Sequence, residues 1–514
     1  MTIDSKGISS EILFYFAPVF RSLILVVPII LFSTCAVWAD AFYMNTRMQE
    51  AYRSATNFRF EKCDSLLNRE RRSNPSNIAT EYISSYKDFL LVFITEDKQL
   101  FEAQKDDMSA RQKRMQEIPE ESPWQRYAEA EILIHTALTK LKFREYFTAG
   151  YQLRKAYRLI EENREEHPEF IPQYPTIGFF HAAISTIPEN YMWIARLAGF
   201  KGTIEQGTAE MDKAVNASRN HKNLNYLLGT AIGLRMIAAL NFERDVEGAG
   251  RLTTKMDPSF SGPLRTFLVA NALLYNDTPG DELEYLRSST LEPEGTQPLY
   301  YLYYMRGLSY LNRLELSAAR ADLTRFIDNY TGTSFMNSAW QKLAWINLME
   351  GDTDGYNECI QRAGTGPEPF TDEDKQAYRE YEQNETPNAI LLRSRVLFDG
   401  RDYNGALGQI AGKDIGSFPT KRDKIELTYR FARISEMTGD HDKALRFYGK
   451  TITNGRETRY YFAANSALHS GYIYESRGDT LNALEHYRMC LKMRGHDYQN
   501  SIDQKAKAGI SRLN

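Results

Sequence analysis

The sequence predicts an all-α protein built from repeated helix–turn–helix units that stack into a solenoid. Three observations lead to this prediction. Small residues, aromatic residues and glycines recur at fixed offsets in the last two-fifths of the chain. Apolar residues upstream recur three and four positions apart, which is the spacing of one buried helix face. The 514 residues include only 31 Gly and 18 Pro but 12% aromatic residues, a composition typical of packed helices.

Composition excludes several classes of protein. The chain has 63 Lys and Arg against 67 Asp and Glu, so it lacks the basic surplus of a nucleic-acid binder, and we expect no nucleic-acid partner. Its mean hydropathy of −0.50, with one apolar run, excludes a membrane protein with many spans. Beyond the apolar run the cysteines are Cys63, Cys359 and Cys490, an odd and widely spaced set, which we expect to be small buried residues without disulfides.

Residues 1–39 are predicted to be a signal peptide or a membrane anchor. Between residues 12 and 39 the only charged residue is Arg21. Three alternatives remain open: cleavage after Ala39, retention of residues 12–39 as an anchor in the membrane, or lipidation at Cys35. In each case we expect the rest of the chain to be exported, periplasmic or membrane-associated in the cell envelope.

Residues 40–290 are predicted to be a degenerate helical repeat region. Residues 123–166 read as two amphipathic helices, and a buried helix from Ile177 is followed by a second helix that starts at Pro188. His135 lies beside the apolar face of the first of these helices. A single histidine in that position is more often a packing residue than a ligand, so we predict no metal site there.

Part of this region is similar to a known family. The segments at residues 150–157, 185–188 and 198–202, with Gly207 soon after, resemble the tetratricopeptide thirty-nine and inclusion-body clearance family over about residues 125–350. The resemblance implies an all-helical adaptor without catalytic residues and with a link to lipid or membrane homeostasis. The export-type leader departs from a cytosolic adaptor, so the resemblance is carried over to the fold and not to the role.

Residues 291–514 contain the clearest repeats. Five copies share offsets of 0, 3, 7, 12, 16 and 19 residues, and three of them, starting at Gly307, Ala344 and Ser394, are degenerate. The two strongest copies are Gly471, Tyr474, Gly478, Ala483, Tyr487 and Cys490, and Ala432, Ser435, Gly439, Ala444, Tyr448 and Thr451.

Each offset has a physical role in a helical hairpin. Small residues allow two helices to approach closely, and the aromatic residues fill the space beside that contact. Gly439 and Gly478, each followed by Asp, are predicted to end the first helix of a hairpin and to start the second. These residues resemble the tetratricopeptide repeat. A longer gap between two copies holds residues 364–387, which we interpret as an exposed loop with one short helix.

The sequence contains none of the common catalytic or metal-binding motifs that we considered. The chain has no G-x-S-x-G, H-E-x-x-H, paired C-x-x-C or complete phosphate loop, and no two of its eight histidines are four residues apart. We therefore predict no catalytic residues, no cofactor, no metal and no enzymatic activity.

Stacked repeats do offer a concave binding surface lined by the first helix of each hairpin. Arg and Tyr side chains are the most useful there, since Arg forks onto carboxylates and Tyr supplies contact area at low entropy cost. An equally open alternative is that some of these side chains only pack between repeats. Counting from the small residue of each copy gives the predicted groove residues Tyr301, Tyr304, Lys342, Arg395, Arg430, Arg433, His469 and Tyr472.

The leader and the repeats together predict a function. We expect a non-catalytic exported scaffold or adaptor that binds a protein partner through a concave helical-repeat surface in a cell-envelope assembly. The alternative is a binder or sensor of a lipid or other apolar ligand linked to membrane homeostasis, which the aromatic-rich segment at residues 298–310 and the family resemblance suggest.

Overall fold

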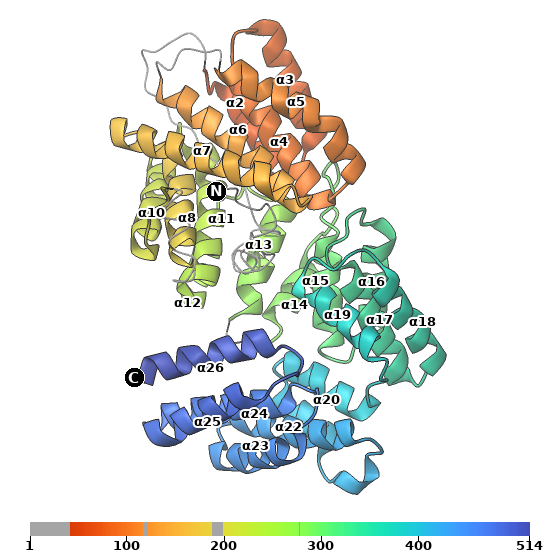
Figure 1. Cartoon of the computed structure of the whole chain (residues 1–514). Helices are drawn as coiled ribbons and strands as arrows, with labels where there is room; N and C mark the ends of the chain where they lie inside the picture. Colours follow the sequence, from red (N-terminus) through yellow and green to blue (C-terminus); the bar gives the residue numbers. More distant parts are fainter. Residues whose placement is uncertain (1–41, 117–121, 188–198, 277, 514) are drawn as a thin grey trace, which may run out of the picture. The chain divides into compact units, whose positions relative to one another are not determined.

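The computed structural model describes residues 42–116, 122–187, 199–276 and 278–513, in which every regular element is a helix (Figure 1). The predicted leader at residues 1–39 lies outside the described residues, and so does the start of the predicted helix at Pro188. No helix in the described part combines the length and the apolar character that a membrane span requires. The predicted all-α class is confirmed for the described residues.

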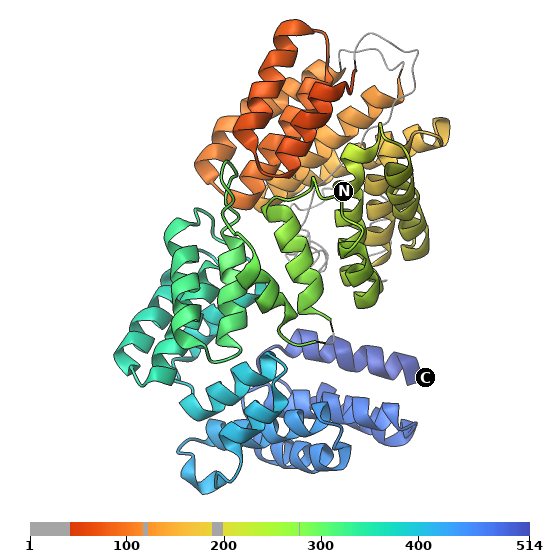
Figure 2. The ribbon, with the colours of Figure 1, turned by 180° about the vertical axis from the view of Figure 1, so that it is seen from behind.

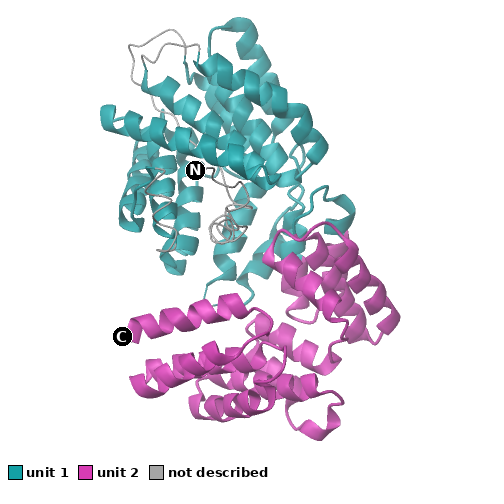
Figure 3. Cartoon of the chain, in the orientation of Figure 1, with its two compact units in different colours: residues 1–306, 325–334 teal, residues 307–324, 335–514 magenta. Residues whose placement is uncertain are grey.

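The chain forms two compact units (Figure 3). Unit 1 comprises residues 1–306 and 325–334, and unit 2 comprises residues 307–324 and 335–514. The sequence analysis put the boundary between the two repeat regions after residue 290. The boundary between the two compact units falls within helices α15 (Tyr301–Leu311) and α16 (Leu316–Asn329).

The described α-helices of unit 1 range from 8 to 21 residues in length. The predicted pair of helices at residues 123–166 is confirmed as α6 and α7, which pack against each other. Its described helices are α2 (Thr46–Thr56), α3 (Phe60–Ser73), α4 (Ala79–Thr95), α5 (Lys98–Gln116), α6 (Pro123–Lys142), α7 (Tyr146–Glu166), η1 (Ile171–Gln173), α8 (Tyr174–Ser185), α10 (Ile204–Asn220), η2 (Asn225–Leu227), α11 (Leu228–Ala238), η3 (Ala239–Glu243), α12 (Val246–Thr253), α13 (Pro263–Leu274) and α14 (Asp281–Ser288).

The core of unit 1 is rich in buried aromatic rings. Tyr52 of α2 is fully buried, and its hydroxyl donates to Thr230 Oγ1 of α11 at 3.1 Å. His135 is confirmed as a packing residue, because its ring stacks on Phe89 and its Nδ1 lies 3.1 Å from Ser85 Oγ. Burial lowers the pKa of His135 to about 3, with a smaller contribution from the charge of Arg111, so the ring is neutral.

Helices α8 and α10 approach each other through two glycines. A methyl group added at Gly207 would lie 2.2 Å from the carbonyl oxygen of Gly178, and one added at Gly178 would lie 2.6 Å from that of Gly207. The two backbones therefore meet at a distance that only hydrogen atoms allow.

Unit 2 is a row of helical hairpins. The first helices of four hairpins, α17, α20, α22 and α24, contact one another in succession, and α26 contacts α24. Figure 2 shows the same succession from behind. The helices are α17 (Met336–Glu350), α18 (Thr353–Thr365), α19 (Asp372–Gln383), α20 (Ala389–Asp399), α21 (Tyr403–Ile410), η4 (Ile415–Ser417), α22 (Lys421–Met437), α23 (His441–Gly455), α24 (Phe462–Ser476), α25 (Thr480–Lys492) and α26 (Gln499–Leu513).

The turn inside each hairpin has one construction. A residue with positive φ ends the first helix, and the next residue, an aspartate, accepts a hydrogen bond from a backbone N–H of the second helix. Gly439 and Gly478 adopt this conformation with φ of 84° and 74°, as predicted. Arg401 takes the same place with φ of 63°, although a side chain makes this conformation costly.

The repeat offsets correspond to real contacts. A methyl group at Gly471 would lie 2.4 Å from the ring of Tyr487, so the small residue at offset 0 makes room for the ring at offset 16. Tyr487 donates its hydroxyl to Glu475, and Tyr448 donates in the same way to Glu436 in the preceding hairpin. Unit 2 therefore has tetratricopeptide-like architecture, and the short helix predicted within residues 364–387 is α19.

The cysteine prediction is confirmed in part. The described thiols are free, and Cys63 and Cys490 are buried. Cys359 is only half-buried, because it lies on the outer helix α18, where its Sγ is 3.5 Å from Asn347 Nδ2.

Candidate partner-binding groove

Three of the first helices of the unit 2 hairpins, α20, α22 and α24, contribute to the lining of a polar groove. We call it the cationic groove, and its cavity measures about 290 Å³. Helices α19, α20 and α22 supply one part of the lining. The start of α24 and the segment from Asp497 into α26 supply the rest.

Positive charge exceeds negative charge in this lining. The cations are Arg379, Arg395, Arg422, Arg430 and Lys505, and the acidic residues are Glu380, Glu426 and Asp497. Proximity of so many cations in a partly enclosed space attracts anionic groups.

Arg430 is the cation with the closest carboxylate. Its Nη2 lies 2.7 Å and its Nε 3.1 Å from Glu426 Oε1, one helical turn away, and both side chains are buried. Burial alone would raise the pKa of Glu426, but Arg430 and Arg422 hold it below its ordinary value. This pair therefore stays ionised and fixes the floor of the groove.

The other cations are less well neutralised. Arg422 reaches Glu385 and Glu426 only at 3.9 Å and 4.0 Å, and its Nη1 is buried without a hydrogen-bond partner among the described residues. Arg395 lies 3.7 Å from Asp399. Lys505 is exposed, with no ion pair recorded in the described part of the chain. Guanidinium groups in this state are suited to receive a carboxylate.

The lining residue Glu380 joins α19 to two other helices. Its carboxylate accepts hydrogen bonds from Gln341 Nε2 at 2.6 Å, Trp345 Nε1 at 2.9 Å and the Tyr356 hydroxyl at 3.2 Å. These three donors are neutral and come from α17 and α18. The contacts set the position of α19 and hence of Arg379, one residue earlier.

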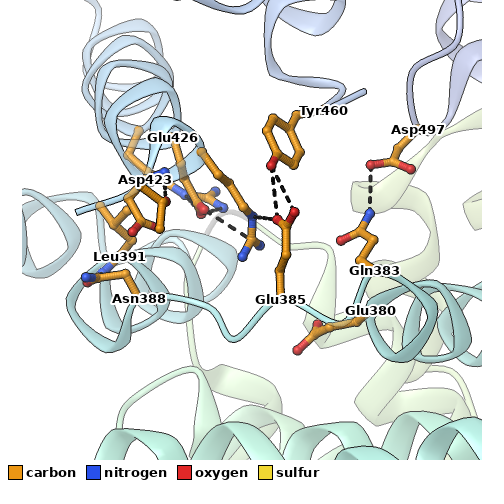
Figure 4. Close-up of polar contacts among 12 residues, drawn as sticks. Glu380, Gln383, Glu385, Asn388, Leu391, Asp423, Glu426, Tyr460 and Asp497 are labelled. Atoms are coloured by element: carbon orange, nitrogen blue, oxygen red, sulfur yellow. Dashed lines mark hydrogen bonds and ion pairs between the residues drawn. The ribbon is translucent and has the colours of Figure 1, made fainter. Parts of the chain in front are cut away.

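Two further contacts fix the rim, and Figure 4 shows Gln383 facing Asp497 and Glu385 facing Tyr460. Gln383 Nε2 donates to Asp497 at 2.8 Å, and the Tyr460 hydroxyl lies 3.1 Å from both oxygens of Glu385. Arg459 also pairs with Glu385 at 2.5 Å. The connection after α19 is thereby held against the start of α24.

Three of the predicted groove residues lie at or beside this groove. Arg395 and Arg430 line it. Lys342 does not line it, but its ammonium lies 3.8 Å from the Trp345 ring centroid and 2.6 Å from Gln341 Oε1, and both of these residues donate to the lining residue Glu380. Burial, together with the charge of Arg395, lowers the pKa of Lys342 to about 7. Its role in binding a partner stays a prediction.

Three more predicted residues form a separate cluster. Arg433 Nη1 lies 2.6 Å from His469 Nδ1, and the His469 ring makes an edge contact with Tyr472 at 5.5 Å. Glu436 also contacts Arg433 and His469. This cluster joins α22 to α24. Its contacts are therefore of the kind expected from the alternative that these side chains pack between repeats.

The last two predicted residues belong to unit 1. Tyr304 is buried with its ring 5.4 Å from that of Phe326, and Tyr301 packs 6.0 Å from Phe267. Tyr301 and Tyr304 also contact each other at 5.5 Å. Both are aromatic packing residues, and their predicted part in binding is untested.

The sequence pattern missed several groove residues. Arg379 lies in the helix inserted between repeats, and Tyr498 and Lys505 follow the last repeat, so no repeat offset points to them. Arg422 lies ten residues before the small residue of its own repeat, in the first turns of α22. Its position one helical turn before Glu426 could have indicated that Arg422 lies on the same helix face as Glu426 and Arg430.

Unit 1 contains a larger polar hollow of about 790 Å³ beside α7, α8 and α10. Its charges are mostly paired: Arg164 with Glu161 at 2.7 Å, Arg158 with Glu162 at 3.3 Å, and His181 with both Glu161 and Glu210. Across the described ranges, no three His, Cys, Asp or Glu side chains gather as they would around a metal ion.

Comparisons with known proteins add little to this description. No protein-family model and no curated protein matches the chain. The resemblance of residues 125–350 to the tetratricopeptide thirty-nine family therefore stays a prediction. The architecture of unit 2 is established by the contacts of its own helices.

Solved structures of helical proteins match at low similarity. A Rap protein complexed with competence and sporulation factor has 12% identity and a TM-score of 0.31, covering 80% of this chain and 97% of that one. The apo form of RapI has 12% identity and a TM-score of 0.28, covering 91% and 98%. The Cut9–Hcn1 hetero-tetramer of APC/C has 12% identity and a TM-score of 0.24, covering 87% and 86%.

Proposed function

We propose that this protein is a non-catalytic helical-repeat adaptor that binds a protein partner through the cationic groove of unit 2. The observation that carries the proposal is the row of first helices lining a groove whose arginines are incompletely neutralised. Stacked hairpins build extended concave surfaces, and such surfaces bind other chains. Charged side chains line both described cavities, which suits a polar partner better than a lipid.

A capture experiment tests this function. The tagged full chain is compared with a variant carrying Arg395→Glu and Lys505→Glu, and with a control carrying Arg488→Glu on the exposed face of α25. We expect one stoichiometric protein with the unaltered chain and the control, and its loss with the groove variant at unchanged thermal stability. Recovery of no stoichiometric protein, or equal recovery by the groove variant, contradicts the proposal.

We further propose that the adaptor acts in the cell envelope as an exported or membrane-attached protein. The support is the apolar run at residues 12–39, with one charged residue. Intact mass of the mature protein distinguishes the three alternatives: a start after Ala39, an unchanged N-terminus, or a lipid mass on Cys35. A full-length protein recovered only from the cytosol contradicts this part of the proposal.

A further inference from the structure

We propose that the cationic groove binds an acidic segment of its partner that also carries an aromatic residue, and that the chain's own turn at residues 495–498 competes for the same place. This inference rests on the proposed function of the groove. It adds the chemistry of the partner and a competitor within the chain.

The turn shows which groups the groove accepts. The Asp497 carboxylate accepts a hydrogen bond from Gln383 Nε2 at 2.8 Å. The next ring, Tyr498, lies 4.5 Å from the guanidinium of Arg379 and makes an edge contact with Tyr461 at 5.3 Å. One carboxylate and one aromatic ring, adjacent in sequence, are therefore already bound by groove residues.

The rest of the groove could bind more of the same groups. Arg395 and Lys505 line it without a hydrogen-bonded carboxylate among the described residues, and Arg422 keeps a buried, unpartnered Nη1. A carboxylate would satisfy this donor, and charge-assisted bonds to arginine are among the strongest hydrogen bonds in proteins. Tyr460 and Tyr461 provide flat rings beside these charges, which suit an aromatic side chain.

The turn is held by the bond from Gln383 to Asp497, by Arg379 against the Tyr498 ring and by one backbone bond, and a partner segment would have to replace these contacts. Tyr498 has φ of 59°, a left-handed conformation that a residue with a side chain adopts at a cost. The residue remains 36% exposed although its ring lies against groove residues. One backbone bond, from Asp497 N–H to the Arg459 carbonyl at 2.9 Å, ties the turn to the start of α24.

A synthetic peptide of alternating Glu and Tyr, labelled with a fluorophore, tests the chemistry by anisotropy with the full chain. The matched peptide has Gln in place of every Glu. We expect the Glu peptide to bind about ten-fold more tightly or better, because each carboxylate bound to arginine contributes a charge-assisted hydrogen bond. We also expect its affinity to fall as salt is raised. Equal affinities for the two peptides overturn the proposal.

Variants then locate the site. Arg395→Gln combined with Arg422→Gln should weaken the Glu peptide by about ten- to a hundred-fold, which corresponds to the loss of charged hydrogen bonds. Arg488→Gln, which removes an exposed cation of α25 outside the groove, should leave the affinity unchanged. If the double variant is unfolded, Lys505→Gln on the exposed face of α26 must still weaken binding. Equal affinity of the groove variants and the control overturns the assignment.

The competing turn has its own test. Asp497→Asn with Tyr498→Asn removes the charge and the ring but keeps a residue that tolerates the left-handed conformation. We expect the Glu peptide to bind about three- to ten-fold more tightly, because an occupied site lowers apparent affinity. Unchanged or weaker binding overturns the competition. If the capture experiment gives a stoichiometric partner while these peptide tests fail, the adaptor function stands and this inference falls.

Discussion

Units 1 and 2 are both helical, but the charged side chains described above are paired differently in the two units. In unit 1, two buried clusters pair opposite charges: His181 lies between Glu161 and Glu210, and Lys142 pairs with Glu96. In unit 2, the groove contains arginines that lack a closely bound carboxylate. The comparison teaches that these paired charges of unit 1 tie its helices together, whereas the incompletely paired arginines of unit 2 are the groups that we propose receive a partner.

The largest effect should come from breaking a buried pair in unit 1. Lys142 and Glu96 are 3% and 5% exposed, so Lys142→Met leaves a buried carboxylate without its cation. We expect the free energy of unfolding of unit 1 to fall by about 3–5 kcal/mol. Hydrogen exchange in urea, read by mass spectrometry for peptides of each unit, measures this. Lys62→Met breaks an exposed pair with Glu50 and should cost less than about 1 kcal/mol, and equal losses would contradict the contrast.

The next effect tests the close approach of α8 and α10. Gly207→Ala places a methyl group 2.2 Å from a backbone oxygen of Gly178, which cannot rotate away. We expect a loss of about 2–3 kcal/mol in unit 1, because the two helices must separate. Gly150→Ala in α7 meets nothing within 4 Å and is the control, with an expected gain of about 0.5–1 kcal/mol. The same exchange measurement reports both variants.

A smaller effect is expected at the matching position of unit 2. Gly471→Ala meets the Tyr487 ring, a side chain that can shift, and the higher helix propensity of Ala offsets part of the cost. We expect a net loss of about 1 kcal/mol, measured by thermal unfolding and by exchange in unit 2. Gly449→Ala in α23, with open space around it, should stabilise unit 2 by about 0.5–1 kcal/mol. A stabilising Gly471→Ala would show that the ring contact carries little weight.

The smallest effect separates the units by pH. Burial lowers the pKa of His181, but hydrogen bonds to Glu161 and Glu210 raise it more, so its pKa lies above the ordinary 6.5. Its contribution to unit 1 is complete below pH 6.5 and is lost as pH rises through the folded pKa.

In unit 2, burial lowers the pKa of His469 below 6.5. The contribution of His469 to the stability of unit 2 therefore grows as pH rises towards 6.5. Exchange at a series of pH values should show that unit 1 loses stability as pH rises above 6.5. It should also show that unit 2 loses stability as pH falls below 6.5. His181→Gln should remove the loss of stability of unit 1 above pH 6.5 and leave the pH dependence of unit 2 unchanged, and a loss of the same size in the variant would contradict the assignment.

The sequence revealed unit 2 better than unit 1 for a physical reason. In a hairpin repeat, Gly471 meets Tyr487 sixteen residues later, so a contact appears as an offset that recurs. In unit 1, Tyr52 bonds to Thr230, a separation of 178 residues that no local pattern records. Helices α6, α7 and α8 of unit 1 were predicted from their apolar spacing, but the order in which the helices pack was not.

The same reasoning explains which groove residues could be predicted. Arg395 and Arg430 lie on first helices of repeats, where counting from the small residue of the repeat indicates which side chains face the concave side. Arg379 and Tyr498 come from an inserted helix and from the segment after the last repeat, and only the folded chain brings them to the groove. Arg433, His469 and Tyr472 satisfy the offset too and contact one another instead of lining the cationic groove, and their predicted part in binding stays a prediction.

The turn with positive φ followed by aspartate has a consequence for how such a protein can change. Because this turn fixes the length of the link inside a hairpin, extra residues are accommodated in the links between hairpins. The link between α18 and α20 is longer than the other links between hairpins, and its helix α19 contributes Arg379 and Gln383 to the groove. New specificity can therefore arise by lengthening one link while every hairpin remains as it is.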